Sequence, residues 1–175
     1  GGHNRRLRFK DGREINAWCL HRGEEESQCL GWATVIDPEI GILCFDDDAG
    51  SPIAVLWQYV VHTNSNFGRH LSADYPGVVA ARIRERFGPA VVPIFVPGAC
   101  ADVNPNFRYR ELGDIVAGLI IERLDKRKPR DGGVLLGARK LEMAVPYRDL
   151  SVDPDERIRA SQWHPDQAGT FRREW

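Results

Sequence analysis

Two long apolar runs, separated by a helical pattern, dominate the middle of the chain. They cover residues 53–61 and 90–96, and neither alternates regularly between hydrophobic and polar positions. Near-continuous Val, Ile and Leu runs are typical of strands that are buried on both faces. The helical pattern between them predicts a right-handed crossover, which would make the two strands parallel neighbours in one sheet.

Two amphipathic helices are predicted to pack on this sheet. The first begins near Pro76, because proline suits the first helical position and Asp74 or Tyr75 stands where an N-cap belongs. Its apolar face holds Val79, Ile83 and Phe87. The second covers about residues 110–127, with apolar positions at helical spacing: Leu112, Ile115, Val116, Leu119, Ile120 and Leu124.

Shorter patterns complete the predicted architecture. Residues 7–9 and 15–20 flank a turn and predict a hairpin. Further strands are expected at 40–45 and 134–146, a polar helix from 153 to 163, and a frayed end at 167–175. The predicted fold class is therefore α/β, with a mixed, partly parallel sheet flanked by helices. The predicted core contains Val55, Trp57, Val79, Ile83, Val91, Ile94, Val96, Ile115, Leu119 and Leu124.

Length and charge exclude several classes of protein. The chain has 175 residues, which suits one domain with a sizeable core. Its formal charge is −1, from 24 basic and 25 acidic residues, and neither sign is concentrated as in a nucleic-acid-binding surface. No apolar run approaches the roughly 18 residues of a membrane span, and no signal-peptide pattern stands at the start. Because the chain begins with Gly-Gly-His rather than Met, we expect that a natural N-terminus has been removed.

Cysteines and charged groups suggest no chemistry of their own. Cys19, Cys29, Cys44 and Cys100 lack the Cys-x-x-Cys spacing of zinc or redox sites, so buried thiols are expected, with one disulfide as the alternative. The aspartate run 46–48 lacks the distal glutamate of a calcium loop and predicts a solvated hairpin turn. The basic groups at 108–110 and 123–128 are predicted to be solvated helix ends and loops.

The candidate chemistry lies after the two apolar strands. The first run ends on His62, and polar loops follow at 71–77 and 97–106. In α/β sheets, ligands bind beyond the carboxyl ends of the strands. An imidazole at such a strand end is a candidate metal ligand or general base, and a histidine satisfied within the core is the alternative.

These segments resemble, in order and spacing, the neutral/alkaline (non-lysosomal) ceramidase superfamily across residues 3–150. The resemblance rests on Asn4-Arg5-Arg6, Asp37-Pro38-Glu39, Leu43-Cys44-Phe45-Asp46-Asp47, Gly50-Ser51-Pro52-Ile53-Ala54-Val55-Leu56, Tyr59-Val60-Val61-His62, Ser72-Ala73-Asp74-Tyr75-Pro76-Gly77 and Gly98-Ala99-Cys100-Ala101-Asp102-Val103-Asn104-Pro105. It implies a zinc-dependent amidohydrolase whose metal is held by two histidines, a glutamate and a tyrosine, and whose substrate is ceramide or a related N-acyl lipid. It also suggests a secreted or periplasmic protein.

The resemblance assigns roles to individual residues. His62 matches the second histidine ligand of zinc, and Arg5 matches the arginine of the Asn-Arg motif at the substrate pocket, where it would stabilise an oxyanion. Asn104 stands where ceramidases have a serine, so it would donate a hydrogen bond rather than be acylated, unless the Asx-Pro turn is only structural. Asp74 has two predicted roles, a helix cap or a hydrogen bond that orients His62.

The matched region contains one of the four zinc ligands of the family. His3, His21, His70 and His164 fall at no ligand position and are expected to be ordinary loop or surface residues. Residues 1–175 are therefore predicted to be an interior piece of a larger catalytic domain. The alternative is a non-catalytic scaffold or binding module without a complete metal site. An unrelated α/β hydrolase lacks support, because no Gly-x-Ser-x-Gly elbow is present, and the sequence predicts no oligomeric state.

Overall fold

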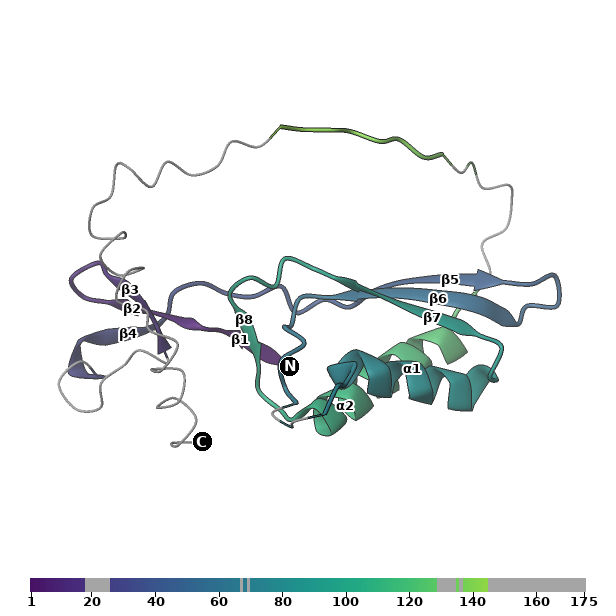
Figure 1. Cartoon of the computed structure of the whole chain (residues 1–175), viewed down its shortest axis with the longest axis horizontal. Coiled ribbons are helices and arrows are strands. Elements are labelled where there is room, and N and C mark those ends of the chain that lie inside the picture. Colours follow the sequence, from purple (N-terminus) through teal and green to yellow (C-terminus); the bar gives the residue numbers. More distant parts are fainter. Residues whose placement is uncertain (18–25, 67, 69, 129–134, 136, 145–175) are drawn as a thin grey trace. The chain divides into compact units, whose positions relative to one another are not determined.

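The structure is a computed structural model that describes residues 1–17, 26–66, 68, 70–128, 135 and 137–144. The chain divides into two units, Gly1–Asp131 and Gly132–Trp175. In the described part of the chain, every helix and strand belongs to the first unit (Figure 1). None of its helices is long and apolar enough to cross a bilayer.

The main sheet confirms the predicted mixed, partly parallel arrangement. Its strand order is β5 (Gly41–Asp46), β6 (Pro52–Tyr59) and β7 (Val92–Pro97). β5 and β6 form an antiparallel hairpin, whereas β6 and β7 are parallel and are connected through α1 (Asp74–Phe87). Because β6 and β7 run in the same direction, the loops that follow them leave the sheet at the same edge.

Both helices pack on one face of the main sheet (Figure 1). α2 (Tyr109–Asp125) lies against α1, and a methyl group on Gly113 would come within 2.5 Å of Val78 Cβ. The interior is built from the sheet residues Val55 and Trp57, which are fully buried, and from the buried positions of the two helices. These helix positions are Tyr75, Val79, Ile83, Leu112, Val116, Ala117, Ile120 and Leu124.

The prediction that the strands are buried on both faces is wrong for the described residues. Ile94 and Val96 are 41% and 38% exposed, because they point away from the helices, and no described element covers that face. Ile115 and Leu119 were also predicted in the core and are 41% and 53% exposed. The buried face of α2 runs through Leu112, Val116, Ile120 and Leu124 at intervals of four, and the two exposed residues lie beside it. The other predicted core residues are buried: Val55, Trp57, Val79, Ile83, Val91 and Leu124.

A smaller sheet and a two-stranded ladder complete the first unit. The smaller sheet has the order β3 (Glu14–Asn16), β2 (Arg6–Phe9) and β4 (Cys29–Trp32), and a 3₁₀ turn, η2 (Glu26–Gln28), precedes β4. The predicted hairpin is confirmed as β2–β3, although its second strand ends at Asn16. β1 (Gly2–Asn4) pairs with β8 (Val103–Pro105) in antiparallel fashion. The sequence did not predict β1, β4 or β8.

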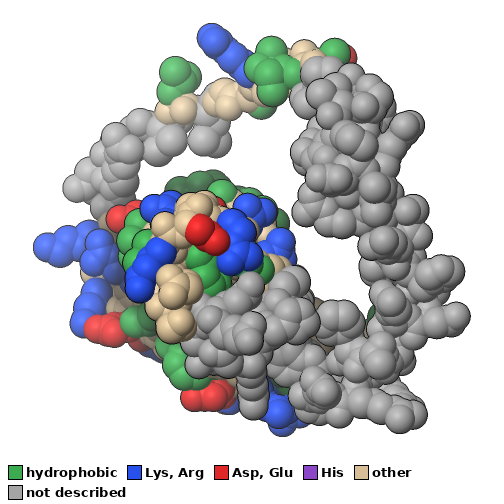
Figure 2. All heavy atoms as spheres, turned by 90° about the vertical axis from the view of Figure 1, so that its left-hand side faces the viewer, with side chains coloured by type: hydrophobic (Ala, Val, Ile, Leu, Met, Phe, Trp, Pro, Cys, Tyr) green, Lys and Arg blue, Asp and Glu red, His purple; other side chains and the backbone are tan. Residues whose placement is uncertain are grey.

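The surface at the end of the smaller sheet mixes charged and hydrophobic side chains. Figure 2 shows basic groups there interspersed with acidic and apolar ones. Arg8 and Glu14 pair across β2 and β3 at 2.9 Å. Leu30 and Trp32 of β4 are 62% and 53% exposed. Arg13 likewise pairs with Asp11, so part of the basic charge at this end is matched by neighbouring acidic groups.

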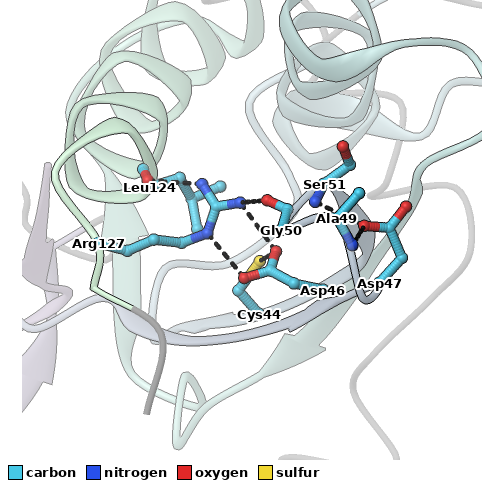
Figure 3. Close-up of polar contacts among 8 residues, drawn as sticks. All are labelled: Cys44, Asp46, Asp47, Ala49, Gly50, Ser51, Leu124 and Arg127. Carbon is cyan, nitrogen blue, oxygen red and sulfur yellow. Dashed lines mark hydrogen bonds and ion pairs between the residues drawn. The ribbon is translucent and has the colours of Figure 1, made fainter. Parts of the chain in front are cut away.

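The acidic turn after β5 is only partly the solvated turn that the sequence predicted. Asp47 Oδ1 accepts hydrogen bonds from the amides of Ala49 and Ser51, which closes the turn (Figure 3). Asp46 instead pairs with Arg127, whose side chain is only 23% exposed (Figure 3). The prediction of a solvated Arg127 is therefore wrong, because this guanidinium joins the end of α2 to the β5–β6 hairpin.

Several other predictions concern the cysteines and the C-terminal part. Cys29, Cys44 and Cys100 are free, half-buried thiols, and Cys19 lies outside the described residues. A strand was expected at 134–146, but the described residues 135 and 137–144 form none. The expected helix at 153–163 and the stretch 167–175 lie outside the described residues.

Candidate functional site

The candidate site lies where the loops after β6 and β7 meet the β1–β8 ladder. The amide of His62 donates to the carbonyl oxygen of Val103 at 3.1 Å, and the amide of Arg5 donates to that of Asp102 at 2.7 Å. β1 and β8 are in register so that His3 faces Asn104 and Asn4 faces Val103. Segments that are far apart in the sequence therefore meet at one edge of the main sheet.

Asn4 is the buried anchor of this arrangement, and it is 2% exposed. Its side-chain amide donates to Thr34 Oγ1 at 2.6 Å and to Asp102 Oδ2 at 2.8 Å. Its Oδ1 accepts the amide of Arg6 at 2.8 Å. Both donors of its side-chain amide are engaged, so Asn4 ties β1 to Asp102 immediately before β8 and to Thr34 after β4.

Arg5 presents an unused donor. Its backbone is fixed on both sides, since its carbonyl oxygen accepts the amide of Ala17 at 2.8 Å and its own amide bonds to Asp102. The Nε of its guanidinium is buried and has no hydrogen-bond partner. A buried donor without a partner is unfavourable by about 1–3 kcal/mol. A ligand oxygen beside Nε would remove that penalty.

Asn104 and Asn64 present unused acceptors. Asn104 is 3% exposed and lies within β8, so it belongs to the β1–β8 ladder and not to a turn, and a purely structural role stays the alternative. The Oδ1 atoms of both residues are buried without a hydrogen-bond partner. Asn64 was not predicted; its position two residues after His62 is the only sequence signal that pointed to it. Among the described residues, one buried N–H donor, Arg5 Nε, and two buried oxygen acceptors, on Asn64 and Asn104, thus have no hydrogen-bond partner.

His62 is half-buried, and its backbone is fixed by the bond to Val103. Among the described residues, no group of three or more His, Cys, Asp or Glu side chains lies close enough to hold a metal ion. The described residues therefore do not form a complete zinc site. His3 bonds to Asn106 Oδ1 at 2.5 Å and stacks on Trp32 at 4.8 Å.

Asp74 takes neither of its two predicted roles in the expected form. It is the first residue of α1, whereas the N-cap position is Ala73, which makes no capping hydrogen bond. Its buried carboxylate accepts hydrogen bonds from Ser65 Oγ at 2.5 Å, from the amide of Asn66 at 2.7 Å and from the amide of Tyr75 at 2.8 Å. Two of these bonds therefore reach the loop after His62, the third stays within α1, and none is made to the imidazole ring.

A separate groove lies between the N-terminal parts of α1 and α2. Its volume is about 460 Å³, and its walls include Asp74, Arg82, Tyr109, Arg110 and Asp114. Arg82 is already paired with Asp114 at 2.9 Å. His62, Arg5 and Asn104 do not line this groove, so it is distinct from the candidate site.

Comparison with known proteins gives two similar structures. No family model and no curated protein matches the chain. A neutral ceramidase from Pseudomonas aeruginosa has a TM-score of 0.48 and 19% identity, over 52% of this chain and 17% of that chain. A ceramidase complexed with C2 has a TM-score of 0.47 and 21% identity over the same shares. At these identities the likeness concerns the fold alone. Both structures come from the class of enzyme that the sequence resembles, and the chain spans about a sixth of their length.

Proposed function

We propose that this chain is part of a ceramidase-like hydrolase domain that cleaves an N-acyl amide, either ceramide or a related lipid. One observation carries the proposal. Three segments on which the sequence resemblance rests meet in the structure: Asn4-Arg5, the strand end at His62, and Asp102-Val103-Asn104. They are joined by the hydrogen bonds that the backbone amides of Arg5 and His62 donate. Asn4 and Asp102 are 98 positions apart in the sequence and are joined by a side-chain hydrogen bond. This meeting is expected if the segments serve one site.

The free polar atoms of the site suit an amide substrate. An amide offers a carbonyl oxygen, which the Nε of Arg5 would bind as negative charge develops on it. It also offers an N–H, and a lipid with a polar head adds hydroxyl groups, both of which suit the amide oxygens of Asn104 and Asn64. Asn104 has no nucleophilic group, so the proposal contains no acyl-enzyme at this position.

His62 is proposed as one ligand of a catalytic zinc ion in the intact protein. A bound zinc ion would lower the pKa of its water to about 7 and polarise the scissile carbonyl. One imidazole cannot hold zinc against water, so the other ligands would come from parts of the polypeptide outside the described residues. The proposal therefore assigns to this chain one ligand and the substrate-contacting groups of a larger catalytic domain.

The test is the zinc content and amidase activity of the natural protein that contains this chain. We expect about one zinc per polypeptide by elemental analysis, and hydrolysis of a fluorogenic N-acyl amide. His62→Ala should lose both while its circular dichroism stays native. His70→Ala, at an exposed position on the same connection, is the matched control and should lose neither.

Two outcomes would contradict the proposal. Retention of stoichiometric zinc by His62→Ala would exclude His62 as a ligand. A folded natural protein with neither zinc nor amidase activity would favour the non-catalytic scaffold instead. The purified 175-residue chain is expected to bind zinc only weakly and to be inactive, because it contains one of the four zinc ligands.

A further inference from the structure

Two consecutive residues at the start of α1, Asp74 and Tyr75, hold the His62 loop, residues 61–66, from both sides. Upstream of the histidine, the hydroxyl of Tyr75 donates to the carbonyl oxygen of Val61 at 2.7 Å. Downstream, the carboxylate of Asp74 accepts from Ser65 and from the amide of Asn66. The loop is thus fixed immediately before His62 and again just after Asn64.

Tyr75 is built into the core as a hydrogen-bond donor. It is fully buried, and its ring contacts Trp57 at 6.2 Å and Phe95 at 5.8 Å in edge-to-face geometry. Burial raises the pKa of the Tyr75 phenol well above its ordinary value, so the hydroxyl keeps its proton at neutral pH. Its bond to Val61 is therefore not interrupted by ionisation.

Asp74 has an unfavourable backbone conformation. Its φ is 55°, which is unusual for a residue other than glycine, and its side chain is 6% exposed. A non-glycine residue in this region is strained and persists only where the surrounding structure compensates. Glycine would relieve the strain, but it would remove the carboxylate that holds Ser65 and Asn66. The hydrogen bonds to Ser65 and Asn66, together with the one to the Tyr75 amide, compensate this strain, so the conformation of Asp74 serves both the loop and the first turn of α1.

We infer that Asp74 and Tyr75 are positioning residues that fix the direction in which the loop presents His62 and Asn64. The inference rests on the proposed function, in which His62 binds a zinc ion. Asp74 and Tyr75 would act on His62 through the loop backbone and Ser65, because none of their side-chain hydrogen bonds reaches the imidazole. The remaining bond, from the Tyr75 amide to the Asp74 carboxylate, lies within α1.

Asp74→Gly and Asp74→Asn, compared in the natural protein below their unfolding midpoints, separate positioning from folding. Glycine accepts the positive φ but leaves the Ser65 hydroxyl and the amides of Asn66 and Tyr75 without their acceptor, so the unfolding midpoint of Asp74→Gly should fall. In the folded variant, kcat and zinc affinity should also fall about 10- to 100-fold, as for residues that orient a metal ligand. Asparagine tolerates the same φ and keeps an oxygen acceptor, so Asp74→Asn should retain most of the kcat and of the zinc affinity that Asp74→Gly loses. Ser72→Ala is the control, because it removes a hydroxyl that bonds the amide of Asp74 and leaves the side-chain bonds to Val61, Ser65 and Asn66 in place.

A second variant and a direct measurement keep the test decisive. Tyr75→Phe keeps the buried ring and deletes only the hydroxyl, and it should lower kcat with little effect on KM. In the natural protein, NMR should show that Asp74→Gly loosens the His62 side chain and speeds amide exchange at His62 and Asn64. Unchanged kcat, together with an equally ordered His62 in these variants, would overturn the inference. If the natural protein proves to have no zinc or activity, the proposed function fails. The NMR comparison still decides whether Asp74 and Tyr75 hold His62 and Asn64 in place.

Discussion

Arg127 ties the end of α2 to the β5–β6 hairpin, and breaking this tie should destabilise the first unit. Its Nε donates to Asp46 Oδ2 at 3.1 Å and its NH2 group donates to Asp46 Oδ1 at 2.8 Å. The same guanidinium also donates to the carbonyl oxygens of Gly50 at 3.0 Å and Leu124 at 2.8 Å (Figure 3). We therefore expect Asp46→Asn to weaken the link and Arg127→Ala to remove it.

The magnitude follows from the burial and geometry of the pair. The two side chains are 23% and 19% exposed, so the pair is less screened than a surface salt bridge, which contributes about 0–1 kcal/mol. Hydrogen bonds to charged groups contribute about 1.5–3 kcal/mol. Arg127→Ala should thus lower the free energy of unfolding by about 2–3 kcal/mol, and Asp46→Asn by about 1–2 kcal/mol.

The pH dependence has a definite sign. The hydrogen bond from Arg127 is the main cause that lowers the pKa of Asp46 below its ordinary value. A carboxylate with a lowered pKa in the folded state stabilises the fold above its unfolded pKa of about 3.9, and it loses that contribution as the pH falls. The difference between the wild type and Asp46→Asn should therefore be largest above about pH 5 and shrink towards pH 3.

Urea unfolding monitored by circular dichroism at pH 7 and pH 3 tests this reasoning. Glu14→Gln serves as the control, because it breaks the more exposed pair with Arg8 and should cost less than about 0.5 kcal/mol. A double-mutant cycle between Asp46 and Arg127 should give a coupling above about 1 kcal/mol. A coupling near zero, or a difference that does not change with pH, would refute the argument.

Two further predictions concern other contacts of the first unit. Burial and the neighbouring Asp46 raise the pKa of Cys44 from 9.0 to about 11, so mass spectrometry should show Cys44 reacting with iodoacetamide at pH 8 about 100-fold more slowly than a free thiol of ordinary pKa. A reaction as fast as that of a free cysteine would contradict this burial. Gly113→Ala should destabilise the fold by about 1–3 kcal/mol, because its methyl group would lie 2.5 Å from Val78 Cβ. Gly118→Ala, with nothing within 4 Å, should instead stabilise α2 by about 0.5–1 kcal/mol; equal urea midpoints for the two variants would contradict the packing argument.

The main sheet and both helices could be predicted because their signals are local. Long apolar runs and helical periodicity depend on neighbouring residues, and they placed β6, β7, α1 and α2 within a few residues of their ends. β1, β4 and β8 were missed for the opposite reason. Each has three or four residues and exists through its pairing, as when Asn4 of β1 lies opposite Val103 of β8. A pattern of three residues contains no information about so distant a partner.

The sequence predicted which segments meet at the candidate site, and the roles of their residues stay predictions. Arg5, His62 and Asn104 were identified in the sequence, and their segments meet. The sequence predicted no role for Asn4 beyond its place beside Arg5 in the Asn-Arg motif. In the structure, its side chain bonds to both Thr34 and Asp102. The role of Asp74 could not be predicted, because it depends on a positive φ and on hydrogen bonds to Ser65 and Asn66 that arise only once the loop folds back onto α1.

The outer face of the main sheet shows what an apolar pattern does and does not specify. Leu43, Leu56 and Ile94 lie side by side across the three strands on the face away from the helices, and the first and last are 53% and 41% exposed. Parallel strands occur almost only where both faces of a sheet are covered, and each exposed aliphatic side chain forgoes about 1.5–3 kcal/mol of burial. The run in β6 predicted burial on both faces, whereas only the face towards the helices is buried in the described residues. It did not indicate which element covers each face, because hydrophobicity measures how strongly a residue avoids water and carries no information about its neighbours. The core was overestimated at Ile94 and Val96 for that reason, whereas Val55 and Trp57, which face the helices of the same chain, were assigned correctly.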